Sequence, residues 1–207
     1  MVQRRCQPMW ALAGLAIVEL AVLLDCAALV VDIMAGRRIV GGTPVPEIGL
    51  EFRSDLSQAA NLAIPAAVLV GGSLFVLWFY CAYRQRAESG VEGGGAPSTR
   101  FDPIWSLIGW IVPGLNLVRP PQIMDELTGR RSLVGAWWGL WFVGGLIQVG
   151  MRFISPETQQ GWVRWHSTLL AANVLLLASL AIAVVLVIRA GSVTMLPPRR
   201  LEAPARL

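Results

Sequence analysis

The stretch "GWIVPGLNLVRPPQIMDEL", residues 109–127, begins like a membrane-spanning helix and then loses its apolar character. Pro113 and Gly114 interrupt the apolar run, and Asn116 and Arg119 add polar groups before it reaches the length of a span. A helix needs about 20 apolar residues to cross a hydrocarbon core roughly 30 Å thick. We therefore expect this stretch to enter the membrane and return to the side from which it came.

The residues around the interruption predict where the first helix of this segment begins and ends. Asp102 provides a capping side chain and Pro103 suits the first helical position, so a short helix should begin here. Pro113 removes a backbone donor, and the glycine after it tolerates a turn, so the helix should end there. Together these signals predict a re-entrant segment over residues 103–118.

A short amphipathic helix should follow the re-entrant segment. Pro120 opens residues 120–129, whose apolar side chains share one face and whose last residue, Gly129, suits a helix C-cap. We expect this helix to lie on the membrane surface. Asn116 can bond backbone groups that the prolines leave free, and Arg119 can reach a carboxylate or a lipid phosphate.

The rest of the chain has the composition of an integral membrane protein. It is 55% hydrophobic and 14% charged, with a mean hydropathy of +0.60, whereas a soluble domain carries about 25% charged residues. Residues 1–190 are expected to form one all-α polytopic membrane helical bundle, and the Pro- and Arg-rich residues 191–207 a disordered cytoplasmic tail. Four apolar runs are long enough to be transmembrane helices: residues 10–34, 62–83, 133–151 and 167–188.

The distribution of arginines indicates which side of the membrane each segment faces. With four spans, twelve of the seventeen arginines share one face and five lie on the other; with five spans the split is seven to ten. Cytoplasmic loops carry the excess of basic residues, so four spans are favoured, with both termini and the broken segment on the cytoplasmic side. Arginine without any lysine is typical of a GC-rich bacterial genome, so we expect a bacterial cytoplasmic membrane.

The broken segment also carries a recognisable string of residues. The pattern P-x-x-N-L-x-R-P-x-Q-x-M-x-E-L includes Pro113, Asn116, Arg119, Pro120 and Gln122, which we take as the candidate motif site. The pattern resembles the hallmark of a bacterial membrane-protein family, domain of unknown function 4328. The resemblance extends over residues 62–147 and includes a pair of tryptophans downstream. It implies a multi-pass membrane architecture, and it implies no activity because none is established for the family.

Charged side chains inside the first apolar run are candidates for function, because a charge in the membrane is costly. Glu19 and Asp25 could form a proton or cation site, with Asn173 or Gln148 as neutral partners. Asp32 lies near the far end of the same run, where we expect it to be an interfacial residue only.

A structural role for the glutamate is the favoured alternative. Glu19 could bond to Arg119 or Asn116 and so tie the re-entrant segment to the first span. A transporter of this size would more often show paired broken helices or an internal repeat, and neither is evident in the sequence.

No catalytic, metal-binding or cofactor motif is evident in the sequence. His166 is the only histidine, and Ser167 beside it is expected to be a helix N-cap. Catalytic residues, metal sites and cofactors are therefore all predicted to be absent. Nucleic acid is not an expected partner, because the arginines flank apolar runs instead of forming one patch. The G-x-x-x-G string at residues 135–139 would suit a homo-oligomer, although a chance occurrence is at least as good an explanation.

Three functions remain open from the sequence. The favoured one is a non-enzymatic membrane module whose cytoplasmic face binds anionic lipid headgroups or a membrane-protein partner. The alternatives are a small proton- or cation-coupled transporter or channel, and an intramembrane enzyme that would need Glu19, Asp25 or His166 to converge on a pocket. The residues proposed for lipid binding are Arg119, Arg130, Arg131, Trp137 and Trp138.

Overall fold

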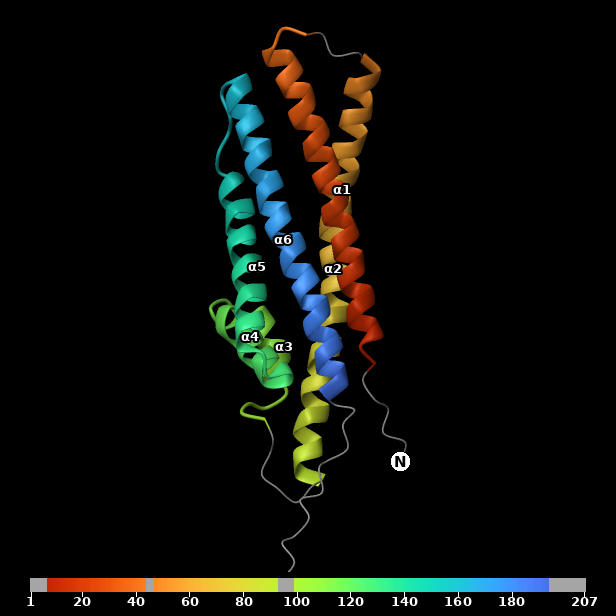
Figure 1. The fold of residues 1–207 in the computed structure, drawn as a ribbon, viewed down its shortest axis with the longest axis vertical. Helices are drawn as coiled ribbons and strands as arrows, with labels where there is room; N and C mark the ends of the chain where they lie inside the picture. Colours follow the sequence, from red (N-terminus) through yellow and green to blue (C-terminus); the bar gives the residue numbers. More distant parts are fainter. Residues whose placement is uncertain (1–6, 44–46, 93–98, 194–207) are drawn as a thin grey trace, which may run out of the picture.

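The computed structural model describes residues 7–43, 47–92 and 99–193, and these residues form six helices without any strand (Figure 1). Four of the helices, α1, α2, α5 and α6, are long and apolar enough to cross a membrane. The predicted all-α membrane bundle with four transmembrane helices and a broken segment is therefore confirmed. The helices are α1 (Met9–Val40), α2 (Glu47–Glu92), α3 (Trp105–Ile111), α4 (Leu115–Thr128), α5 (Arg131–Met151) and α6 (Gln159–Val193).

The long helices extend well beyond the apolar runs that predicted them. α1 continues to Val40, and α6 begins at Gln159, where the sequence had suggested a start at residue 167. Hydropathy marks only the lipid-facing part of a helix, whereas the backbone ladder continues through polar residues as long as a neighbouring helix supports it. Most of the tail predicted over residues 191–207 lies outside the described residues.

The four long helices are arranged in the order α2, α1, α6, α5. α1 packs on α2 and on α6, and α6 packs in turn on α5 (Figure 1). α1 and α2 approach closely at Gly14 and Gly71, where a methyl group added to either glycine would overlap the carbonyl oxygen of the other. Small residues permit this approach of two backbones in the membrane.

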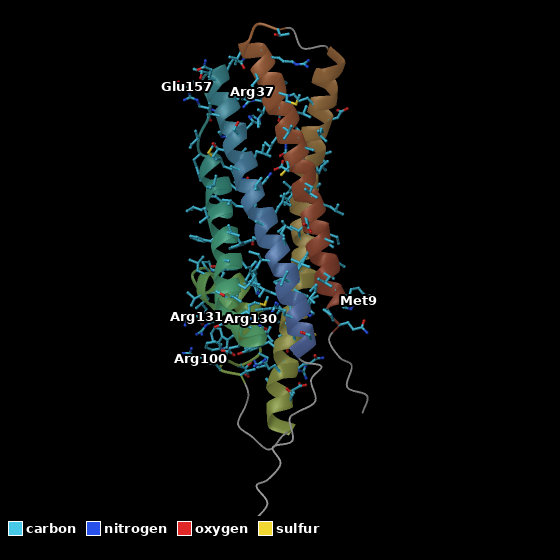
Figure 2. All side chains as sticks on the ribbon, in the orientation of Figure 1. Met9, Arg37, Arg100, Arg130, Arg131 and Glu157 are labelled. Carbon is cyan, nitrogen blue, oxygen red and sulfur yellow. The ribbon has the colours of Figure 1, made fainter. Side chains whose placement is uncertain are left out.

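The broken segment occupies only the end of the bundle at which Met9 lies (Figures 1 and 2). α3 and α4 contact α2, and α4 also contacts α5 and α6, so the pair fills the space beside α2 at this end. The main hydrophobic core lies here, where α4 packs against the long helices. Its largest fully buried apolar or aromatic side chains include Phe79, Tyr83, Ile123, Met124, Leu127 and Leu186.

The apolar face of α4 therefore faces protein and not lipid. Ile123 and Met124 are 0% exposed, although the sequence suggested a helix lying on the membrane surface. The amphipathic pattern is present, but its apolar side packs into the core between α2, α5 and α6.

The break after α3 is confirmed, but its start lies later than predicted. The Asp102 carboxylate accepts a hydrogen bond from the amide of Ile104 at 2.9 Å in the turn before the helix, which begins at Trp105 with Ile104 as its N-cap and without a side-chain cap. Gly114 adopts a φ of 84° at the break between the helices, and Gly129 adopts a φ of 62° after α4. The Gly129 amide donates to the carbonyl of Asp125 at 2.7 Å, as expected of a C-cap.

The start of α4 differs from the prediction. The helix begins at Leu115 and carries Pro120 and Pro121 inside it. Neither proline has an amide to donate, so the carbonyls of Asn116 and Leu117 lose their usual partners four residues on. The indole of Trp138 on α5 donates to the Leu117 carbonyl at 2.9 Å. A tertiary contact that the sequence did not reveal thus allows the helix to begin before the prolines.

Candidate functional site

The motif residues of the broken segment hold α3 and α4 together. Arg119 donates to the side-chain oxygen of Gln122 at 3.2 Å. Its guanidinium also lies 4.2 Å from the centre of the Phe101 ring and 5.5 Å from that of Trp105. Gly109 of α3 faces the arginine so closely that an added methyl group would lie 2.8 Å from the Arg119 Cβ atom. In this arrangement Arg119 is a packing element of the segment.

A second set of contacts ties the segment to α2. The Tyr83 hydroxyl donates to the Glu126 carboxylate at 2.7 Å and accepts a bond from the Phe101 amide at 3.1 Å. The Arg100 amide also donates to Glu126, at 3.2 Å. These bonds therefore fix the residues that precede α3 and the last part of α4 to Tyr83 of α2.

The predicted bond from Glu19 to Arg119 or Asn116 is wrong. Arg119 has the contacts given above, and the backbone amide of Asn116 donates to the Val112 carbonyl. Among the described residues, no hydrogen bond joins either residue to Glu19. α1 packs on α2 and α6, whereas α4 packs on α2, α5 and α6, so the two helices are not neighbours.

The predicted lipid-binding residues divide into two groups. Trp137 is 4% exposed and lies in the core, where its carbonyl accepts a bond from Ser179, so its prediction as a lipid contact is wrong. The Trp138 indole donates a hydrogen bond to the Leu117 carbonyl. Arg130 and Arg131 are exposed, and Figure 2 places them with Arg100 at the Met9 end of the bundle, opposite Arg37 and Glu157.

Of the two neutral partners suggested for Asp25, Asn173 contacts it directly and Gln148 contacts Asn173, whereas no hydrogen bond joins Glu19 to them among the described residues. Asn173 on α6 donates to the Asp25 carboxylate at 2.6 Å, and Gln148 on α5 donates to the side-chain oxygen of Asn173 at 2.5 Å. Three helices therefore share one chain of hydrogen bonds. At 1.5 Å per residue, this chain lies about 22 Å along α1 from Trp10, within the apolar run of residues 10–34.

Asp32 was missed as a site residue. We expected it to be interfacial only, but it is 6% exposed and has three partners. Arg53 and Ser57 of α2 both donate to its carboxylate, the hydroxyl at 3.3 Å, and the Nε2 atom of His166 lies 3.4 Å away. We call these four residues the Asp32 cluster. The signal that could have revealed it is spacing: Asp25 and Asp32 are seven residues apart, as are His166 and Asn173 on α6.

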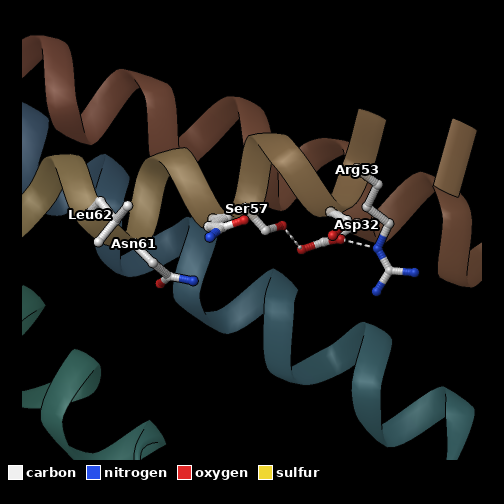
Figure 3. Close-up of a pocket in the computed structure, with 7 residues that line it drawn as sticks. Asp32, Arg53, Ser57, Asn61 and Leu62 are labelled. Carbon is white, nitrogen blue, oxygen red and sulfur yellow. Dashed lines mark hydrogen bonds and ion pairs between the residues drawn. The ribbon is translucent and has the colours of Figure 1, made fainter. Parts of the chain in front are cut away.

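A groove of about 540 Å³ opens over the Asp32 cluster. Figure 3 shows Asp32 between Arg53 and Ser57, with Asn61 and Leu62 further along α2. The groove is lined by Asp32, Arg53, Ser54, Ser57, Gln58, Asn61 and Leu62.

The residues required by the enzyme hypothesis do not converge. Glu19, Asp25 and His166 are not among the residues that line the groove, and Asp25 and His166 have different partners. Ser167, predicted to cap a helix, lies inside α6 and donates to the Val163 carbonyl at 2.8 Å. Within the described ranges, no group of three or more His, Cys, Asp or Glu side chains could hold a metal ion.

The comparison with known proteins bears on the family and not on the activity. Nothing among the curated proteins or the solved structures matches this chain. A family model does match, over residues 46–192, which include α2, the broken segment and both later transmembrane helices. With its multi-pass helical bundle and its motif locked between α2 and α5, the chain belongs to the family described as domain of unknown function 4328.

Proposed function

We propose that this protein is a non-enzymatic membrane module that binds anionic lipid headgroups at the end of the bundle that carries α3 and α4. The proposal assigns that end to the cytoplasm, because it carries the larger share of arginines. The observation that carries it is the exposed group of Arg100, Arg130 and Arg131 beside the broken segment. We call these three residues the basic base.

The apolar residues of the broken segment support the same function. Ile111 is 79% exposed and Val118 is 49% exposed, on the two sides of the turn between α3 and α4. Exposed apolar side chains at this position can contact lipid acyl chains, while the exposed arginines at the same end of the bundle can bind the lipid phosphates. Each basic residue near an anionic surface contributes about 1 kcal/mol.

The test compares two pairs of exposed arginines. The full chain in detergent is titrated with phosphatidylglycerol, and bound lipid is counted by native mass spectrometry. Arg130→Gln with Arg131→Gln should weaken binding by about thirtyfold, at about 1 kcal/mol for each arginine. The matched control is Arg37→Gln with Arg38→Gln at the other end of the bundle. If both pairs change binding equally, the basic base has no special role and the proposal fails.

Coupled transport of protons or cations is a second candidate, favoured by the hydrogen-bond chain of Asp25, Asn173 and Gln148. Within the described part of the chain, no basic side chain pairs with the Asp25 carboxylate, although the group lies at membrane depth. A carboxylate in this setting can take up a proton or a small cation.

The second candidate is tested by flux in proteoliposomes. Asp25→Asn should abolish a proton- or cation-dependent flux, because the amide cannot carry the charge. Asp55→Asn, which changes an exposed carboxylate on α2, should leave the flux intact. Absence of any flux from the unaltered protein would remove this candidate.

A further inference from the structure

The Asp32 carboxylate is covered on its buried side by His166. The Nδ1 atom of His166 lies 2.9 Å from the Trp162 carbonyl oxygen, and its Nε2 atom lies 3.4 Å from the Asp32 carboxylate. The imidazole therefore lies on the buried side of the carboxylate, and Arg53 lies at the groove.

Arg53 is the charged group of the cluster that the groove exposes most. Asp32 and His166 are both 6% exposed, whereas the Arg53 side chain is 27% exposed. The charge that a ligand in the groove can reach is therefore that of the Arg53 guanidinium.

Arg53 is held in place at the edge of the groove. Its Nε atom donates to Asp32, and its guanidinium carbon lies 4.6 Å from the centre of the Trp162 ring. This guanidinium is held by a carboxylate on one edge and by an aromatic ring on one face. It therefore loses little conformational entropy when it binds a second anion. Its terminal amino groups point away from Asp32 in Figure 3.

The groove continues from this charge as a strip of neutral hydrogen-bonding groups. Ser54, Ser57, Gln58 and Asn61 follow Arg53 along α2 at helical spacing. Hydroxyls and amides of this kind can donate to the oxygens of an anion or of its ester groups.

The strip ends where the lipid-facing surface of α2 begins. Leu62 lines the groove and is 67% exposed, and Leu69 two turns further on is 72% exposed. At 1.5 Å per residue, Asp32 lies about 33 Å along α1 from Trp10, close to the roughly 30 Å thickness of a hydrocarbon core. The Asp32 cluster is thus at headgroup level in the leaflet opposite the basic base.

We propose that the groove over Arg53 and the Asp32 cluster is a binding site for a phosphate oxyanion, supplied by a phospholipid headgroup whose acyl chains run along α2 from Leu62. The phosphate oxygens accept from the Arg53 guanidinium, and the ester and glycerol oxygens meet Gln58 and Asn61. A free phosphate ion has the same charged chemistry without the acyl chains, and it would use the same donors.

The experiment uses the full chain in detergent with Arg130→Gln and Arg131→Gln already in place, so that these two arginines of the basic base no longer contribute. Two probes are titrated, phosphatidylglycerol by native mass spectrometry and inorganic phosphate by calorimetry. Arg53→Gln should weaken phosphatidylglycerol binding by about tenfold, the value of a lost hydrogen bond to a charged group. Arg164→Gln, an exposed arginine at the same end, is the control and should leave the affinity unchanged.

A second variant guards against unfolding of the groove in Arg53→Gln. Gln58→Leu with Asn61→Leu alters only exposed side chains and keeps the Asp32 cluster intact, so it should weaken the lipid in the same direction. If Arg53→Gln weakens the binding of phosphate but not that of phosphatidylglycerol, the groove is an oxyanion site whose ligand is the free ion. The proposal is overturned if neither Arg53→Gln nor Gln58→Leu with Asn61→Leu weakens the binding of either probe. It is also overturned if Arg164→Gln has as large an effect as Arg53→Gln.

Discussion

At the scale of single residues, Trp138 supplies the hydrogen-bond donor that Pro121 lacks. Pro121 has no amide to offer the Leu117 carbonyl, and the Trp138 indole donates to that oxygen at 2.9 Å. The Trp138 ring also stacks on Trp141, with centroids 4.7 Å apart. One side chain of α5 therefore pairs a backbone carbonyl of α4 that would otherwise lack a donor, which makes the proline tolerable inside the helix.

Replacing this tryptophan should expose the cost of an unpaired carbonyl. Trp138→Phe keeps an aromatic ring but removes the donor, and we expect it to lower the free energy of unfolding by about 1–3 kcal/mol. The measurement is denaturant unfolding in detergent. Trp141→Phe is the control, because the Trp141 side chain is 38% exposed and no bond to a backbone carbonyl is observed for it among the described residues. Equal losses in the two variants would show that ring packing, and not the hydrogen bond, is what stabilises α4.

At the scale of elements, the two interfaces of α2 are built on different chemistry. Near its end, α2 is attached to the broken segment by polar contacts of Tyr83 with Glu126 and Phe101. Along its apolar stretch it meets α1 through the contact of Gly14 with Gly71, where the backbones themselves touch. In lipid no hydrophobic force drives helices together, so close packing of small residues carries much of the association.

The glycine contact should therefore be sensitive to a single methyl group. In Gly71→Ala the new Cβ would overlap the Gly14 carbonyl oxygen and force α1 and α2 apart, which we expect to cost about 1–3 kcal/mol of unfolding free energy. Gly72→Ala is matched in sequence and chemistry, and its added methyl group meets nothing within 4 Å. Both are measured by unfolding in detergent. A destabilisation by Gly72→Ala as large as that by Gly71→Ala would mean that helix propensity, and not the contact, decides the outcome.

At the scale of the whole molecule, the main hydrophobic core lies at one end of the bundle and two buried polar groups lie toward the other. The core of α2, α4, α5 and α6 lies at the Met9 end, where the broken segment fills the space between helices. Toward the other end α1 and α6 carry two polar layers, one around Asp25 and one around Asp32. The half-length segment α3–α4 is what creates this asymmetry, since it packs one half of the bundle and leaves the groove open in the other.

The sequence predicted the features that depend on composition and local signals, and not those that depend on how helices meet. The spans followed from hydropathy, and the break between α3 and α4 followed from Pro113 and Gly114. Asn173 and Gln148 were anticipated as neighbours of Asp25, but Glu19 does not join their hydrogen-bond chain. The Asp32 cluster was missed because Arg53 lies outside every apolar run, and only a helix longer than its lipid-facing part brings it to α1. Glu19 was misassigned because helix order, which the sequence does not fix, keeps α1 away from α4.

The sidedness of the molecule can be tested with two positions that flank α5. Arg130 precedes this 21-residue helix and Thr158 follows it, and both are exposed. A helix of this length spans about 31 Å, enough to place the two residues on opposite sides of the hydrocarbon core. With the native cysteines replaced, Arg130→Cys and Thr158→Cys are each treated with an impermeant maleimide, first in intact cells and then after permeabilisation. We expect Thr158→Cys to react in intact cells and Arg130→Cys only after permeabilisation, because the arginine-rich end should face the cytoplasm. The reverse order would move the basic base to the outside and with it the proposed lipid site, whereas reaction of both positions in intact cells would mean that α5 does not cross the membrane.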